Sequence, residues 1–427
     1  MRLIACIVVF FFHCFRVDGN ERAVITVTNP NTPLNIGNKV WLYEDRYHTL
    51  IINNLLTHIE LQQDFKQSSQ LMPNFSMTSS AVWCSFTLHN ETTEDLYLKL
   101  NNPRLDTIDF YAVSDSSMGA YTHVKTGMML PYEKRTFETP AYLFALNIAP
   151  NQSKTFYLKV RSSSPIQLPL TVGSLATFWR QSHRADLIQG IYMGFIIVVM
   201  VYQLYLWFTT REKLFLYYAF YSFLSGVNNI DHKGYAMELL WRNVYWVNNF
   251  QATMAALIGF FAVQLTMSLL HTKKNAPLMH RGLQLFLVCV VAVVICNLLG
   301  WYLISGIMSQ ALITSGAAFI IIGSFILWGR GLTRVRFFLL GWLVYMVVAI
   351  LFVLRDANIL PYNILTANML QIGSAFQLIF FMLALADKTA EYKREKEKSQ
   401  QENELMQQQI IAVYKEKERL VREQNAM

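Results

Sequence analysis

The chain has 427 residues, of which 53% are hydrophobic and only 15% are charged, whereas a soluble domain carries about 25% charged residues. This composition excludes an ordinary soluble enzyme and indicates several membrane spans, each of which needs about 20 apolar residues. The net charge is +8, but the Lys and Arg residues lie largely in short loops between apolar runs and in the C-terminal segment, so we expect no nucleic-acid binding.

The N-terminus is typical of a secretory signal. Arg2 precedes an apolar run over residues 3–15, and polar, turn-forming residues follow. A run of about 13 residues is too short to span a bilayer, so we predict that residues 1–19 are removed. Cys84 is then the only cysteine of the exported domain, and no disulfide is expected there.

Residues 20–183 have the sequence pattern of a β-protein. Apolar and polar residues alternate over 82–88, 96–100 and 156–161, and clusters of Asn, Asp, Ser, Gly and Pro separate these runs. Short alternating strands at this spacing predict an antiparallel, all-β sandwich with one solvated face on each sheet. The stretch 50–65 is more helical and predicts a short helix packed on one end.

The predicted sandwich offers binding residues rather than catalytic ones. It has no nucleophile elbow and no zinc-ligand spacing, and its histidines are scattered, so we expect no catalytic residue, metal or cofactor. Aromatic rings with arginines could stack on a sugar and hold its hydroxyls; alternatively they are ordinary strand aromatics. The candidate ligand-binding residues are Trp83, Arg104, Tyr111, Tyr132 and Arg135.

Residues 184–386 contain seven apolar runs, which predict an all-α bundle of seven transmembrane helices. The runs cover residues 187–208, 214–230, 249–270, 282–301, 307–328, 337–354 and 364–386. One alternating set of loops holds eight Lys and Arg residues and the other set three. By the positive-inside rule the first set is cytoplasmic, which places the sandwich outside and the C-terminus inside. We therefore expect a multi-pass protein of a bacterial inner membrane with a periplasmic or extracellular sandwich.

No Lys, Arg, Asp or Glu lies near the centre of a predicted span. Ion-coupled carriers usually need such a residue, so transport is disfavoured, and no lysine is placed to bind retinal. Gln371, Ser374 and Gln377 share one face of the last span, where they could relay a signal or simply hold helices together. The polar loop 228–233 could meet the sandwich or a ligand.

Residues 387–427 predict a charged, exposed helix with an apolar seam at 4-3 spacing. Met406, Ile410, Val413, Leu420 and Met427 follow this spacing if polar residues fill the intervening seam positions, which predicts a coiled-coil homodimer; the alternative is a solvated tail. Asp387 and Lys388 would carry the signal into this helix. The segment lacks histidine and about 40 residues cannot hold a nucleotide-binding domain, so we expect this chain alone not to be an enzyme.

Together these stretches resemble bacterial seven-transmembrane receptors with diverse intracellular signalling modules and a type 2 extracellular domain. The matching residues are 82–90, 102–111 and 127–135 in the exported half, and 190–194, 211–218, 361–363, 371–374 and 383–388 in the membrane half. The resemblance covers residues 34–388. The chain departs from the family pattern in two ways. Gln377 stands where the family often has Glu, and no catalytic module follows the charged helix of residues 387–427 in this chain.

The resemblance implies a jelly-roll sensor similar to carbohydrate-binding modules and a relay to a cytoplasmic output. Our interpretation is a receptor that senses an extracytoplasmic small molecule or glycan and signals through a separate cytoplasmic enzyme. Two alternatives stay open. The chain could be the sensor portion of a truncated histidine kinase or diguanylate cyclase, or a transporter or channel with a ligand-binding cap.

Overall fold

The computed structural model describes residues 23–76, 78–114, 120–242, 244–332, 335–356, 359–360 and 364–424. The predicted signal sequence, residues 361–363 and Met427 lie outside these ranges. The chain forms two compact units. The first extends to Gln189 and also includes Ile230–Asn248, and the second comprises Gly190–Asn229 and the chain from Asn249 onward.

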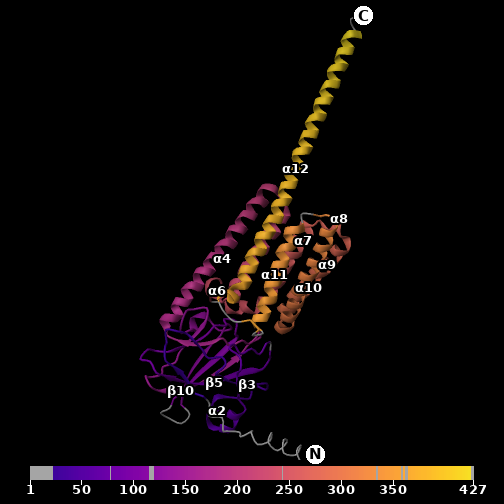
Figure 1. The fold of residues 1–427 in the computed structure, drawn as a ribbon. Coiled ribbons are helices and arrows are strands. Elements are labelled where there is room, and N and C mark those ends of the chain that lie inside the picture. The colour runs from indigo at the N-terminus through magenta and orange to yellow at the C-terminus, as the bar shows by residue number, and fades with distance from the viewer. Residues whose placement is uncertain are drawn as a thin grey trace, which may run out of the picture. The chain divides into compact units, whose positions relative to one another are not determined.

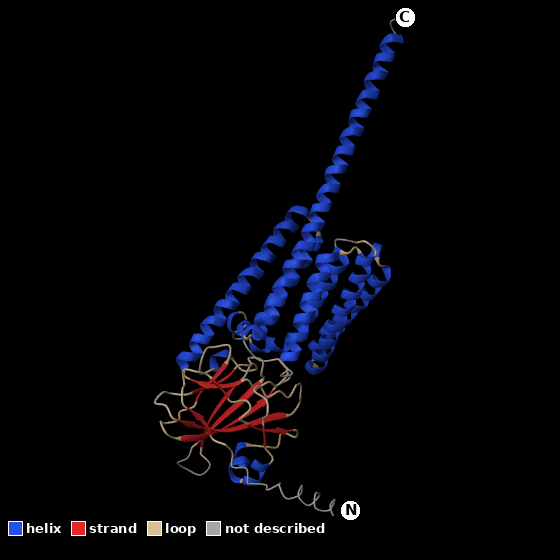
Figure 2. Ribbon diagram, in the orientation of Figure 1, coloured by secondary structure: helices blue, strands red, loops and turns tan. Residues whose placement is uncertain are grey.

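The first unit is a two-sheet β-sandwich (Figures 1 and 2). The larger sheet has, in spatial order, β4 (Lys66–Gln67), β3 (Trp41–Asp45), β5 (Ala81–Asn90), β10 (Ser153–Arg161), β7 (Thr107–Val113) and β8 (Tyr121–Thr126), with β1 (Ile25–Val27) paired to β5. The smaller sheet has β2 (Leu34–Asn35), β11 (Leu170–Gly173), β6 (Tyr97–Leu100) and β9 (Tyr142–Ala145). All these pairings are antiparallel except that of β1 with β5.

The core between the sheets follows from the alternation in the sequence. Every second residue of β5 and β10 points inward, so that Cys84, Phe86, Phe156 and Leu158 are buried in one apolar cluster. The rings of Phe86 and Phe156 stack with centroids 5.5 Å apart. The predicted sandwich is therefore confirmed, and burial of the Cys84 thiol in this core raises its pKa well above the usual range.

The opposite face of the larger sheet is also partly covered. Two short helices, α2 (Ile52–Thr57) and α3 (Ile59–Gln63), stand where one helix at an end of the sandwich was predicted. Leu50, Ile52, Leu55 and Phe65 pack with Trp83 in a second apolar cluster. This cover removes part of the sheet from solvent.

The second unit consists of long helices. They are α4 (Leu175–Thr210), α5 (Lys213–His232), α7 (Gln251–Leu269), α9 (Pro277–Leu298), α10 (Tyr302–Gly329), α11 (Val335–Asp356) and α12 (Ile364–Gln424), where α4 begins and α5 ends in the first unit. Shorter helices are η1 (Tyr132–Lys134), α6 (Tyr235–Leu239), η2 (Tyr245–Phe250) and α8 (Thr272–Asn275). The seven predicted spans fall on the seven long helices.

Six helices in the described part of the chain are long and apolar enough to cross a membrane. The exception among the seven is α5, whose 20 residues include Asn228, Asn229, Asp231 and His232 near the C-terminal end. Asp231 and His232 belong to the first unit, whereas Asn228 and Asn229 belong to the second, where Asn229 is buried and donates to the Ser225 carbonyl at 2.9 Å.

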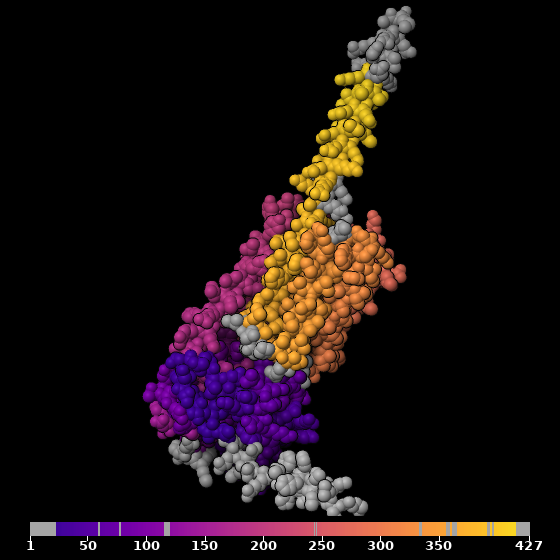
Figure 3. Space-filling model, in the orientation of Figure 1, coloured from indigo at the N-terminus to yellow at the C-terminus, as the bar shows by residue number. Residues whose placement is uncertain are grey.

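Helix α12 continues without a break from the bundle into the charged C-terminal segment (Figure 1). Phe381, Ala384 and Leu385 are buried against other helices of the bundle, whereas all described side chains from Ala390 to Lys415 are exposed (Figure 3). Pairs such as Lys393–Glu397 at 3.9 Å and Lys398–Glu402 at 4.0 Å support this exposed part of the helix.

Candidate functional site

The face of the larger sheet that points away from the sandwich core carries an aromatic and charged cluster. We call this set the sheet-face cluster; it comprises Trp83 of β5, Asp109 and Tyr111 of β7, Tyr121 and His123 of β8, and Lys159 of β10. Strand register aligns Lys159 between Trp83 and Asp109, and Tyr111 next to His123. Alternation along each strand therefore gathers residues that are far apart in sequence.

Ring stacking and ion–ring contacts hold the sheet-face cluster together. Tyr111 stacks on His123 with centroids 4.6 Å apart and on Trp83 at 6.0 Å, and its ring meets Tyr121 edge-on at 5.5 Å. The Lys159 ammonium lies 5.0 Å from the centre of the Trp83 ring and donates to the Leu50 carbonyl at 3.0 Å. This arrangement presents rigid ring faces with little conformational freedom to lose on binding.

Hydrogen-bonding groups border these rings. His123 Nε2 and Asp109 Oδ1 lie 2.9 Å apart, and His123 is exposed while Tyr111, Tyr121 and Asp109 are half-buried. Burial, followed by the Asp109 charge, raises the pKa of Tyr111 to about 12, so its hydroxyl stays protonated and can donate. Burial lowers the pKa of Lys159, although nearby Asp45 and Asp109 oppose the shift.

The predicted ligand residues do not lie in one place. Trp83 and Tyr111 belong to the sheet-face cluster, but Trp83 is fully buried beneath the α2–α3 cover, so a ligand can reach it only by displacing that cover. Arg104, Tyr132 and Arg135 lie elsewhere, against the segment Ile230–Asn248, which we call the docked segment.

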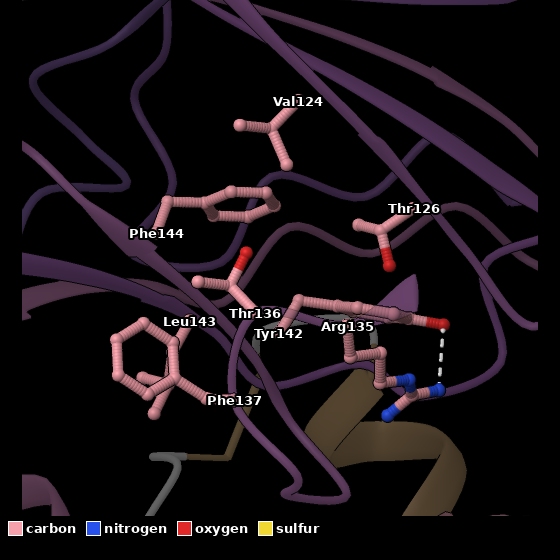
Figure 4. Close-up of a pocket in the computed structure, with 8 residues that line it drawn as sticks. All are labelled: Val124, Thr126, Arg135, Thr136, Phe137, Tyr142, Leu143 and Phe144. Atoms are coloured by element: carbon pink, nitrogen blue, oxygen red, sulfur yellow. Dashed lines mark hydrogen bonds between the residues drawn. The ribbon is translucent and has the colours of Figure 1, made fainter. Parts of the chain in front are cut away.

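Arg135 is buried between two tyrosine rings. Its guanidinium carbon lies 4.6 Å from the centre of the Tyr132 ring and 4.4 Å from that of Tyr142. Nη1 donates to the carbonyls of Thr139 and Pro140 at 2.8 and 3.0 Å, and Nη2 donates to the Tyr142 hydroxyl at 3.3 Å (Figure 4). The adjacent cavity, of about 10 Å³, has room for one water and not for a sugar ring.

The docked segment contacts this arginine and its neighbours. Nη2 of Arg135 lies 3.5 Å from Sδ of Met237, and Met237 is buried with Tyr132 and Met128. Asn248 Nδ2 donates to the Met128 carbonyl at 2.7 Å, and Arg242 pairs with Glu138 at 2.5 Å. The segment is therefore fixed to the sandwich along its length.

The start of the docked segment is fixed in the same way. Nη1 of Arg104 and Nδ1 of His232 lie 2.5 Å apart, so of the two possibilities for the polar stretch 228–233, the sandwich or a ligand, the structure shows contact with the sandwich through His232. Gly234 follows with φ +83°, and a Cβ there would lie 2.5 Å from Cβ of Pro103. Only glycine fits this close approach without strain.

Burial also shapes the charges around the docked segment. Burial raises the pKa of Glu238, because the effect of burial exceeds the opposing effects of the Tyr132 hydroxyl and of Arg135 and Arg242. It raises the pKa of Tyr132 well above its usual range, and it lowers the pKa of Arg104 despite nearby Asp231 and Asp106.

The Glu238 shift predicts a pH effect on stability. A carboxyl group whose pKa is raised in the folded state stabilises that state while it is protonated, and this contribution is lost as pH rises from the unfolded pKa of about 4.3 through the raised value. Glu238→Gln mimics the protonated form, so we expect the variant to unfold at a higher temperature than the wild type at pH 7.5. The two melting temperatures should converge near pH 4, and a constant difference at both pH values would contradict the prediction.

The predicted relay residues lie in the second unit on buried faces of α12. The Tyr192 hydroxyl and Ser374 Oγ are 3.0 Å apart, and the Tyr221 hydroxyl donates to Gln377 Oε1 at 3.0 Å. Gln371 is buried beside them. These bonds tie α12 to α4 and α5.

Two further predicted relay residues tie α12 to other helices where it leaves the bundle. Asp387 Oδ2 lies 3.4 Å from Arg336 Nη2 of α11, and Lys388 Nζ donates to the Ser268 carbonyl of α7 at 3.4 Å. These two contacts place Asp387 beside α11 and Lys388 beside α7.

Sequence reasoning missed several residues of both regions. Asp109, His123 and Lys159 could have been found, since each alternates with a core residue on its own strand. Met237, Glu238 and Asn248 carry no such signal, because their partners are more than 100 positions away in the chain.

Comparison with known families gives two matches. The family described as 7TM diverse intracellular signalling matches residues 185–388, and the family described as 7TMR-DISM extracellular 2 matches residues 37–174. Among curated proteins none matches the chain significantly. The two matched regions correspond to the helical bundle and to the β-sandwich.

Proposed function

This chain belongs to the seven-transmembrane receptors with diverse intracellular signalling, and we propose that it senses a glycan or similar small molecule outside the membrane and passes the signal through its helices to a cytoplasmic effector. The membership makes it a membrane receptor with an extracellular sensor domain. Both matched families are sensor and receptor domains and not catalytic ones, so the proposed output is conformational.

The observation that carries this proposal is the docked segment. Ile230–Asn248 joins α5 to α7, yet it packs as part of the sandwich's own compact unit. The chain passes between the two units at three points, within α4, near the end of α5 and within η2, and we infer that a shift in the sandwich reaches the bundle through them. A ligand can bias such a system only by binding one arrangement more tightly than the other.

The sheet-face cluster is the proposed ligand site. Tyr111 and Tyr121 offer ring faces for stacking on a sugar, while Asp109, His123 and Lys159 offer charged or polar groups for its hydroxyls. This keeps Trp83 as a buried support beneath Lys159 and Tyr111. Arg104, Tyr132 and Arg135 become positioning residues that hold the docked segment.

Binding measurements on the full chain in lipid nanodiscs test the ligand proposal. A panel of neutral and charged oligosaccharides is titrated against the wild type, Tyr121→Ala and Thr122→Ala, the last being an exposed neighbour on the same strand. We expect Tyr121→Ala to weaken binding at least tenfold, about 1.4 kcal/mol, with Thr122→Ala unchanged. If no oligosaccharide binds, or if both variants bind like the wild type, the sheet face is not a glycan site.

The orientation and assembly complete the proposal. The loop bias of eight Lys and Arg residues against three supports a cytoplasmic C-terminus in a bacterial inner membrane. The exposed part of α12 carries Met406, Ile410 and Val413 at 4-3 spacing, all well exposed in a single chain. We infer that this stripe pairs with the same stripe of a second copy and that a separate cytoplasmic signalling enzyme reads the paired helices.

A further inference from the structure

The helical bundle contains a partly open cavity of about 120 Å³ that the proposed function does not use. Side chains of α5, α7, α9, α10, α11 and α12 line it, and all of them belong to the second unit. Its volume is close to that of the engineered cavity of about 150 Å³ that binds benzene in another protein. The space is therefore large enough for a small ring compound.

Small residues on two helices create this space. Ala255, Gly259 and Ala262 of α7 face the cavity, as do Gly316 and Ala317 of α10. A Cβ added at Gly259 would have no neighbouring atom within 4 Å, so the cavity extends to the backbone there. Larger side chains at these positions would fill the cavity, so its volume depends on the small residues that this sequence has there.

One side of the cavity is polar. Tyr221, Ser225, Asn228, Tyr345 and Gln377 line this side. Gln377 is only 2% exposed, and its Oε1 accepts from the Tyr221 hydroxyl at 3.0 Å. Its Nε2, in contrast, has no hydrogen-bond partner within the described part of the chain. A buried donor left without a partner costs about 1–3 kcal/mol, so this amide favours an acceptor placed in the cavity.

No described residue that lines the cavity is charged, so the wall offers nothing to balance an ionic group, which would be costly to bury. We propose that the cavity binds a neutral, largely apolar, membrane-dissolved molecule with one hydrogen-bond acceptor, such as a ketone, directed at Gln377 Nε2. The site is separate from the sheet-face cluster, and its occupant would stabilise one arrangement of α7, α10 and α12.

Photolabelling of the full chain in nanodiscs tests this proposal. The probe is 3-trifluoromethyl-3-phenyldiazirine, a neutral ring compound that labels nearby groups on illumination, and the adducts are mapped by mass spectrometry of peptides. We expect labelled residues of α7, α10 or α12 at cavity-lining positions. Acetophenone should suppress these adducts at least fivefold more effectively than ethylbenzene, a ring compound of similar size that lacks the carbonyl acceptor.

Filling the cavity provides the matched control. Gly259→Leu should reduce the cavity adducts at least fivefold and leave those on exposed residues of α4 unchanged. Gly306→Leu, in α10 outside the cavity and also with open space at its Cβ, should change neither. Adducts confined to lipid-facing residues, or equal competition by the two aromatic compounds on the wild type, would overturn the proposal, and the latter outcome does not depend on any variant folding.

Discussion

Replacing Arg135 with alanine is expected to lower the free energy of unfolding of the first unit by about 3–5 kcal/mol, because three buried or partly buried acceptors lose their donor at about 1–3 kcal/mol each. The change deletes a cation that is packed between the rings of Tyr132 and Tyr142. It removes the donor of three hydrogen bonds. It also removes the contact with Met237. The docked segment should therefore loosen together with the sandwich edge that holds it.

Hydrogen exchange of the full chain in nanodiscs measures this loss of stability in the docked segment itself. A loss of about 3 kcal/mol corresponds to roughly a hundredfold faster exchange, expected for amides between Tyr235 and Asn248. Arg135→Lys should fall between the wild type and the alanine variant, because lysine keeps the charge and loses the planar fork. Arg161→Ala, which removes an exposed arginine of β10, should change nothing. Unaltered protection of the docked segment in Arg135→Ala would show that Arg135 does not hold it.

Alternation along the strands predicted the sandwich core, but not what lies on the other face of the sheet. Trp83 follows the pattern by pointing away from Cys84 and Phe86. It is nevertheless fully buried, because residues of α2 and its flanks pack on that face, whereas the sequence predicted a short helix on one end of the sandwich. A period-2 pattern reports the two faces of a strand and carries no information about distant cover.

The same limit explains the divided set of candidate binding residues. Tyr132 and Arg135 have the composition of a sugar site, yet their rings and guanidinium are used within the protein. Met237, their partner from the loop between two membrane helices, is about 100 residues away in the chain. Composition can indicate cation–ring chemistry, but only the fold decides whether a ligand or the protein itself supplies the partner.

The shared burial of the three polar residues proposed as a relay was more predictable, because a single helix carries them. Gln371, Ser374 and Gln377 recur every three residues, and all three are buried within the bundle. Helical spacing alone fixes which side chains share a face. It did not identify the cavity beside Gln377, since the space depends on small residues from α7 and α10 that lie far away in the sequence.

Inserting alanines after Lys388 is expected to give a periodic change in how two copies of the exposed helix face each other. Buried Phe381 and Leu385 fix the rotation of α12 within the bundle, and Lys388 bonds to α7 at its exit. Each inserted residue rotates everything beyond it by about 100°. One or two insertions should therefore turn the Met406 stripe away from its partner, whereas seven, about 700°, should return it to within about 20° of the original direction.

Oxidative crosslinking of Met406→Cys in membranes measures this rotation without knowledge of the ligand or the effector. We expect a disulfide-linked dimer in the chain without an insertion, at least a fivefold slower reaction with one or two alanines, and recovery with seven. The chain with native Met406 is the control for the native cysteines, of which Cys84 is buried. Equal crosslinking across the series would mean that the exposed helices pair independently of the bundle, and transmission through a rigid α12 would then be wrong. Absence of any dimer would instead show that the exposed helices do not pair. The two outcomes therefore distinguish whether the exposed helices pair from whether the bundle sets their rotation.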